Sequence, residues 1–142
     1  LLDQNHRLQI IKAELEENPK LGVSDVEFSM PQPSYTIDTL VRFKEEHPEH
    51  EYALIMGADN LQNFHKWKNF EQILKDYSIY VYPRHGYEVK GSHSNIHLIE
   101  GVPQMEISAS FIRNSIQQGK DISYLMSEKA WKYTDEMNFY KK

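Results

Sequence analysis

Two short apolar runs constrain the fold more than any other feature of the sequence. They are "YALIMG" at residues 52–57 and "SIYVYP" at residues 78–83. Short continuous runs of this kind are typical of strands buried on both faces, as in parallel sheets. A segment with helical periodicity, "NFEQILKDY", separates them, and "IHLIEGVP" at residues 96–103 adds a further strand. Strands that alternate with helices predict an α/β fold with a mainly parallel sheet and flanking helices.

The other segments complete this pattern. We expect helices capped by Asp3 and running to about Glu17, at residues 36–47, at residues 108–119 with Gly119 as the stop, and at residues 127–137 with Ser127 as the cap. The second of these should bury one face, which consists of Ile37, Leu40, Val41 and Lys44. Alternating Val26, Phe28 and Met30 predict a half-buried strand.

Length and composition limit the classes of protein. The 142 residues suit one domain, whose residues 108–142 form a C-terminal helical part. A net charge of -5 argues against nucleic acid or anionic membrane as partners, and no apolar run is long enough to span a bilayer. The lack of cysteine excludes disulfides and is compatible with a reducing compartment. We therefore expect a cytoplasmic protein.

Histidines occur at spacings that could hold a metal ion on a helix. The two segments are "HPEH" at residues 47–50 and "HSNIH" at residues 93–97. Pro48 and the strand-like surroundings of the second segment argue against a regular helix. We therefore expect no histidine metal site.

Ligands of open parallel sheets bind beyond the carboxyl ends of the strands, so the segments after the strands should carry the function. In "ISASFIR", Ser108 or Ser110 can cap a helix whose free N–H groups would hold a phosphate, and Arg113 can reach the same end. The alternative is an ordinary capped helix whose arginine pairs with a surface acid. In "GADNL", Gly57 ends a strand and Asp59 could accept ribose hydroxyls or simply cap the next helix.

Two aromatic segments carry similar alternatives. Trp67 beside Lys66 offers a stacking surface for a pyridine or purine ring, or else is a core tryptophan. At the junction formed by Ser34, Tyr35 and Thr36, backbone N–H groups could receive a carboxylate, or Thr36 could cap its own helix. Arg84 in "YPRHGY" could contact a phosphate or lie in a solvated loop.

The order and spacing of these segments are similar to those of a known protein family. The set "SYTIDTL", "GADNLQNFHKW", "YPRHGY" and "ISASFIRNSI" resembles the bacterial nicotinate-nucleotide adenylyltransferase family of NAD biosynthesis. The similarity covers nearly the whole chain. It implies a Rossmann-like nucleotidyltransferase fold and adenylyl transfer from ATP to nicotinate mononucleotide, which yields deamido-NAD and pyrophosphate with the help of Mg²⁺ held mainly by substrate phosphates.

The resemblance also implies roles for individual residues. Nicotinate mononucleotide would be bound by Tyr35, Thr36, Trp67 and Arg84, with Trp67 stacked on the pyridine ring. ATP would be bound by Gly57, Asp59, Ser108, Ser110 and Arg113, with Asp59 on the ribose.

One part of the family pattern has no counterpart in this sequence. The family carries an early "GGxFxPxHxGH" element whose histidines act on the ATP phosphates, together with N-terminal strands and a lysine-bearing loop. We identify no catalytic residue here, and we expect this chain alone to be inactive, and either marginally stable or associated with another chain. Two alternatives stay open: a non-catalytic nucleotide-binding module, and an adenylyltransferase for another acceptor such as nicotinamide mononucleotide.

Overall fold

The computed structural model describes residues 2–89 and 93–141, which divide into two compact units. The sheet unit covers residues Val26–Met105. The helical unit combines the residues up to Asp25 with those from Glu106 onward. That residues 1–142 form one domain stays a prediction.

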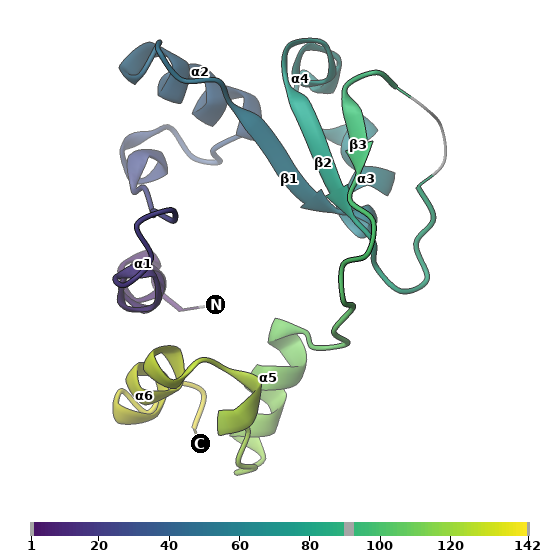
Figure 1. Cartoon of the computed structure of the whole chain (residues 1–142). Coiled ribbons are helices and arrows are strands. Elements are labelled where there is room, and N and C mark those ends of the chain that lie inside the picture. Colours follow the sequence, from purple (N-terminus) through teal and green to yellow (C-terminus); the bar gives the residue numbers. More distant parts are fainter. Residues whose placement is uncertain (1, 90–92, 142) are drawn as a thin grey trace. The chain divides into compact units, whose positions relative to one another are not determined.

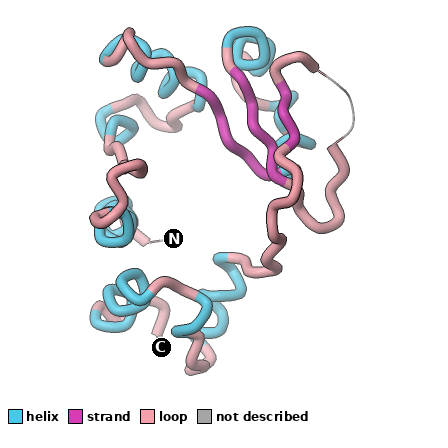
Figure 2. Tube along the Cα trace, in the orientation of Figure 1, coloured by secondary structure: helices cyan, strands magenta, loops and turns pink. Residues whose placement is uncertain are grey.

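The sheet unit is built on three parallel strands in the order β1–β2–β3 (Figures 1 and 2). They are β1 (Ala53–Gly57), β2 (Ser78–Tyr82) and β3 (Ile96–Leu98). The predicted α/β fold with a parallel sheet is thereby confirmed. Strand β3 is shorter than the predicted run to residue 103.

Helices connect and cover these strands. They are α2 (Thr36–Glu46), α3 (Ala58–Gln62) and α4 (Phe70–Asp76), with short 3-10 helices η1 (Val26–Ser29) and η2 (Phe64–Lys66). Buried side chains from these elements and from β1 and β2 form one core: Ile37, Leu40, Met56, Ala58, Phe64, Ile73, Ile79 and Val81.

Only one face of the sheet contributes to this core. The register places Leu54 beside Ile79 and Met56 beside Val81, and the two β2 residues are fully buried. On the opposite face Ile55 is 72% exposed and its neighbour Tyr80 is 41% exposed. The prediction of strands buried on both faces is therefore wrong, because the core helices of this unit all pack on one side.

Two further predictions in the sheet unit are wrong. Residues 26–29 form η1 and no strand, because Ser29 donates to the Val26 carbonyl and the Met30 N–H donates to the Glu27 carbonyl. Such local bonds replace the partner strand that an extended segment needs. On α2, Phe43 is half-buried and stacks on Tyr52, whereas Val41 and Lys44 are exposed.

The helical unit contains α1 (Gln4–Leu15), α5 (Ala109–Gln117), η3 (Ser123–Leu125) and α6 (Glu128–Glu136). Asp3 caps α1, Ser127 caps α6 and Gly119 follows α5 with φ +69°, as predicted. Helices α1 and α6 pack together, and His6 Nδ1 lies 3.3 Å from the Tyr133 hydroxyl. No helix among the described residues is long and apolar enough to cross a membrane.

Candidate active site

A cavity lined by several of the predicted site residues opens at the start of α2. It has a volume of about 300 Å³. Its lining comes from the loop before α2, the first turn of α2 and the segment around η2: Ser34, Tyr35, Thr36, Lys66, Trp67 and Lys68. Three predicted site residues, Tyr35, Thr36 and Trp67, are thus brought together, although more than 30 positions separate Thr36 from Trp67.

The first turn of α2 has uncapped N–H groups. Tyr35 is at the N-cap with extended backbone (φ -119°, ψ 144°) and provides no side-chain hydrogen bond. Among the residues that the structure describes, no acceptor is found for the N–H groups of Thr36 and Ile37. The alternative that Thr36 caps its own helix is therefore wrong, since Thr36 is its first residue. Free N–H groups at the positive end of an eleven-residue helix favour an anion.

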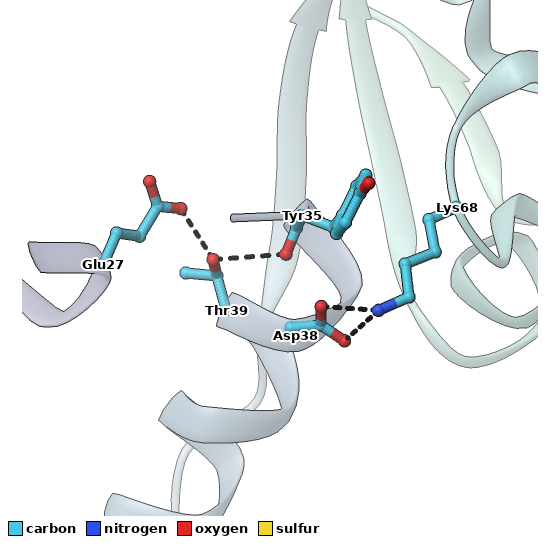
Figure 3. A network of polar contacts seen from close by, with 5 residues as sticks. All are labelled: Glu27, Tyr35, Asp38, Thr39 and Lys68. Carbon is cyan, nitrogen blue, oxygen red and sulfur yellow. Dashed lines mark hydrogen bonds and ion pairs between the residues drawn. The ribbon is translucent and has the colours of Figure 1, made fainter. Parts of the chain in front are cut away.

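A network of polar contacts fixes this end of α2 (Figure 3). The Thr39 hydroxyl donates to Glu27 Oε1 at 2.6 Å and lies 3.4 Å from the Tyr35 carbonyl. Lys68 Nζ contacts both carboxylate oxygens of Asp38, at 2.8 and 3.1 Å, and lies 4.7 Å from the centre of the Tyr35 ring. The helix start is thus tied to η1 on one side and to the segment after Trp67 on the other.

Trp67 contributes to both the cavity and the core. The ring centres of Trp67 and Phe64 lie 5.5 Å apart in an edge-to-face arrangement, and Trp67 is half-buried against the core. The remaining surface of Trp67 lines the cavity. The two predicted roles, core packing and ring stacking, are therefore compatible in one side chain.

A second group of predicted residues meets at the end of β1. Asp59 lies in the first turn of α3, and its Oδ1 lies 3.7 Å from Arg84 Nε. That oxygen is buried and lacks a hydrogen-bond partner among the described residues, whereas the side chain as a whole is 38% exposed. Gly57 occupies the N-cap of α3, so the alternative that Asp59 caps this helix is wrong. The exposed part of the carboxylate can accept from a ligand.

Gly57 is required by this close approach. A Cβ at Gly57 would collide with Asp59 Oδ1 and would lie 3.3 Å from both Arg84 Cγ and Tyr82 Cζ. The guanidinium of Arg84 lies 5.4 Å from the centre of the Tyr82 ring. Arg84 therefore belongs to the group around Asp59, and it is not among the described residues that line the cavity at α2.

In the helical unit, "ISASFIR" forms the start of α5. Ser108 is the N-cap and its Oγ accepts from the Phe111 N–H at 3.1 Å. Arg113 Nη2 donates to Ser110 Oγ at 3.0 Å, and no ion pair of Arg113 is found among the described residues. The capped helix of the alternative is thus confirmed, whereas the Arg113 guanidinium bonds to Ser110 and to no acid among the described residues.

Sequence reasoning missed Lys68, Asp38 and Glu27. Lys68 could have been predicted from the sequence, because "HKWK" places a lysine on each side of Trp67. Asp38 is three positions after Tyr35 in the first turn of α2, and no pattern in the sequence pointed to it. Glu27 was hidden by the expectation of a strand at residues 26–30.

Comparison with known proteins identifies the family. The cytidylyltransferase-like family matches residues 1–115. A Flavobacterium johnsoniae protein named "Probable nicotinate-nucleotide adenylyltransferase" is 51% identical over 146 aligned positions, which cover 100% of this chain and 75% of that protein. A protein of the same name from Flavobacterium psychrophilum is 47% identical with the same coverage.

The chain belongs to the nicotinate-nucleotide adenylyltransferase family. Its fold agrees with solved structures of the family. A Plasmodium falciparum nicotinic acid mononucleotide adenylyltransferase, solved in complex with APC, superposes with a TM-score of 0.78 at 19% identity, covering 99% of this chain and 77% of that one. The complex of that enzyme with NaAD gives a TM-score of 0.77. At this identity the superposition shows the fold alone.

Proposed function

We propose that this chain binds nicotinate mononucleotide and ATP and serves in adenylyl transfer between them, which yields deamido-NAD and pyrophosphate. Membership of the family supports the reaction, and the cavity at the start of α2 supports the acceptor. A role in NAD biosynthesis would place the protein in the cytoplasm. The observation that carries the proposal is the meeting of uncapped helix N–H groups, an indole ring and two lysines in one cavity.

This cavity suits a flat, acidic ring. Within the described part of the chain the N–H groups of Thr36 and Ile37 have no acceptor, so the first turn of α2 can donate to a nicotinate carboxylate. Trp67 presents a ring surface to the pyridine. Lys66 and Lys68 add positive charge at the lining, although Lys68 is shared with Asp38 and Lys66 Nζ donates to Asn63. A neutral amide in place of the carboxylate would lose the charge-assisted part of these hydrogen bonds.

The groups around Asp59 and at α5 suit the other substrate. Asp59 has an exposed carboxylate surface for ribose hydroxyls, and Arg84 beside it can neutralise a phosphate of nicotinate mononucleotide, the substrate to which the resemblance assigns it. Ser110 and Arg113 present a hydroxyl and a guanidinium at the start of α5. In adenylyl transfer the protein mainly positions the two substrates and neutralises charge at phosphorus, which is the chemistry that such groups supply.

The donor set also bears on Mg²⁺. Among the described residues, the only group of three or more metal-ligating side chains lies at residues 47–50 and includes none of the site residues above. The site residues therefore fit a magnesium ion held mainly by substrate phosphates, as the resemblance implies. Bound there, the ion would neutralise phosphate charge.

The test is a calorimetric titration with nicotinate mononucleotide. We expect binding by the wild-type chain, weaker binding of nicotinamide mononucleotide, and about 5- to 100-fold weaker nicotinate mononucleotide binding in Trp67→Ala, the range that loss of ring stacking produces. Trp131→Ala is the matched control, because Trp131 lies on α6 in the helical unit. Equal losses in both variants would contradict the stacking role.

A turnover assay on the same protein separates enzyme from binding module. Release of pyrophosphate from ATP in the presence of nicotinate mononucleotide would support catalysis by these residues and would contradict the expectation that this chain alone is inactive. Binding of both substrates without turnover supports a nucleotide-binding module, and equal turnover with nicotinamide mononucleotide supports the other acceptor. An absence of binding to either substrate contradicts the proposal.

A further inference from the structure

We propose that the turn after α2 is a binding site for a borderline divalent transition-metal ion such as Zn²⁺, separate from the nucleotide site. Its ligands are His47, Glu49 and His50. The sequence argued against a metal site here because Pro48 prevents a helix. The structure brings the same side chains together by a turn.

The ligand atoms are already close to the spacing that a metal requires. Glu49 Oε1 lies 3.7 Å from His47 Nδ1 and 3.6 Å from His50 Nε2, and the three ligand atoms all lie within 4.8 Å of one another. Tetrahedral ligands at bond lengths of roughly 2.0–2.2 Å lie about 3.3–3.6 Å apart. The carboxylate oxygen therefore needs to move by only a few tenths of an ångström relative to each imidazole.

The backbone holds these residues in place without the metal. His47 closes α2, since its N–H donates to the Phe43 carbonyl at 2.9 Å. The His50 N–H donates to the His47 carbonyl at 3.1 Å, which closes a four-residue turn with Pro48 at its second position, where proline is favoured. The Tyr52 hydroxyl donates to the Phe43 carbonyl at 3.0 Å. Binding thus requires ordering of side chains only, which limits its entropic cost.

The kind of ligand selects the kind of ion. Two imidazoles and one carboxylate suit zinc and its neighbours in the first transition row, whereas magnesium and calcium prefer oxygen ligands. The side chains of His47, Glu49 and His50 are 55%, 63% and 61% exposed, which leaves room for water in the remaining positions. Such an open site binds more weakly than a closed structural site.

The local charge also favours a cation. Glu46 and Glu49 bring two carboxylates to the end of α2 and to the turn after it. Arg42 pairs with Glu46 at 2.7 Å and offsets part of that charge, while Glu49 contacts only the two imidazoles among the described ion pairs. The carboxylate of Glu49 is therefore free to act as the anionic ligand.

The turn is separate from the candidate nucleotide cavity. The cavity lies at the first residue of α2 and the turn follows the last, so the eleven residues of the helix put roughly 16 Å between them. The turn also precedes β1, whereas the groups around Asp59 follow it. Loss of the metal ligands should leave nucleotide binding unchanged.

The experiment is calorimetric titration of the full chain with zinc chloride in a non-chelating buffer. We expect one zinc ion per chain and at least about tenfold weaker binding in His50→Gln and in Glu49→Gln, the size of effect that loss of metal-site interactions produces. His65→Gln is the matched control, because His65 is exposed on η2 outside the turn. In the wild type, imidazole ¹⁵N shifts should identify Nδ1 of His47 and Nε2 of His50 as the bound nitrogens.

Circular dichroism of each variant checks that the fold is kept, and a nicotinate mononucleotide titration of His50→Gln should match the wild type. Absence of zinc binding would overturn the proposal. So would equal zinc affinity in His50→Gln and the wild type, or zinc-induced shifts confined to histidines outside residues 47–50. The imidazole measurement on the wild type decides the matter even if a variant fails to fold.

Discussion

The Asp59 carboxylate occupies the space that a side chain at Gly57 would fill, so the glycine sets the position of the acid. The backbone of Gly57 is extended (φ -76°, ψ 155°) and would accept any residue. The requirement is thus steric and local: it concerns one carboxylate oxygen and the Arg84 and Tyr82 side chains behind it.

We expect Gly57→Ala to displace Asp59, to lower stability by about 1–3 kcal/mol, as overpacking does, and to weaken ATP binding. Thermal unfolding and a titration with ATP measure the two effects. Gly22→Ala is the control, because a Cβ there meets no atom within 4 Å. Normal ATP binding by Gly57→Ala would show that the position of Asp59 is unimportant for the nucleotide.

Caps show what a sequence can and cannot predict at this scale. Either Ser108 or Ser110 was predicted as one cap and Ser127 as another, and Ser108 and Ser127 each accept a backbone N–H of their helix. Thr36 looked equally suited, yet Tyr35 is at the N-cap of α2 and Thr36 is the first residue of the helix. The Glu27 carboxylate in η1 accepts from Ser34 and Thr39 at this end of α2, and no local cap pattern contains these contacts.

At the scale of elements, the order of strands and helices was predictable and the burial of the strands was not. The apolar runs at residues 52–57 and 78–83 form β1 and β2 as expected. A continuous apolar run indicates that both faces of a strand can be buried. Whether both are buried depends on the helices that pack on each face of the sheet. Here Ile55 and Tyr80 face away from the core although the sequence does not distinguish them from Leu54 and Ile79.

This asymmetry predicts different costs for one substitution on the two faces. Ile79→Ala removes a fully buried side chain and should lower the free energy of unfolding by about 2–5 kcal/mol. Ile55→Ala, its control on the open face, should cost less than about 1 kcal/mol. Urea unfolding of both variants measures the difference. Equal costs would mean that the open face is covered in solution.

At the scale of the whole molecule, an ion pair joins the two ends of the chain within the helical unit. Lys129 Nζ on α6 lies 2.8 Å from Glu17 Oε1 and 3.7 Å from Glu16 Oε2, just after α1. The hydrogen bond from Lys129 lowers the pKa of Glu17 below its ordinary 4.5, and the same bond raises the pKa of Lys129 above 10.5. Both side chains are exposed, so the stabilisation is small.

The direction of the pH dependence follows from these shifts. The contribution of Glu17 is complete above pH 4.5 and is lost as the pH falls through the lowered pKa, because the protonated acid no longer attracts Lys129. We therefore expect Glu17→Gln to melt at a lower temperature than the wild type at pH 7 and at the same temperature in stronger acid. Glu45→Gln on α2, which has no ion pair among the described residues, should match the wild type throughout.

The helical unit is made from both ends of the chain, and this has a consequence for synthesis. Helix α1 is synthesised before its partner α6, which follows more than a hundred residues later, roughly 6–24 s at ordinary elongation rates. The sheet unit is continuous in the chain and can fold in the meantime. A nascent chain therefore carries α1 without its partner until α6 has been synthesised, and a premature stop before α6 would leave α1 unpaired.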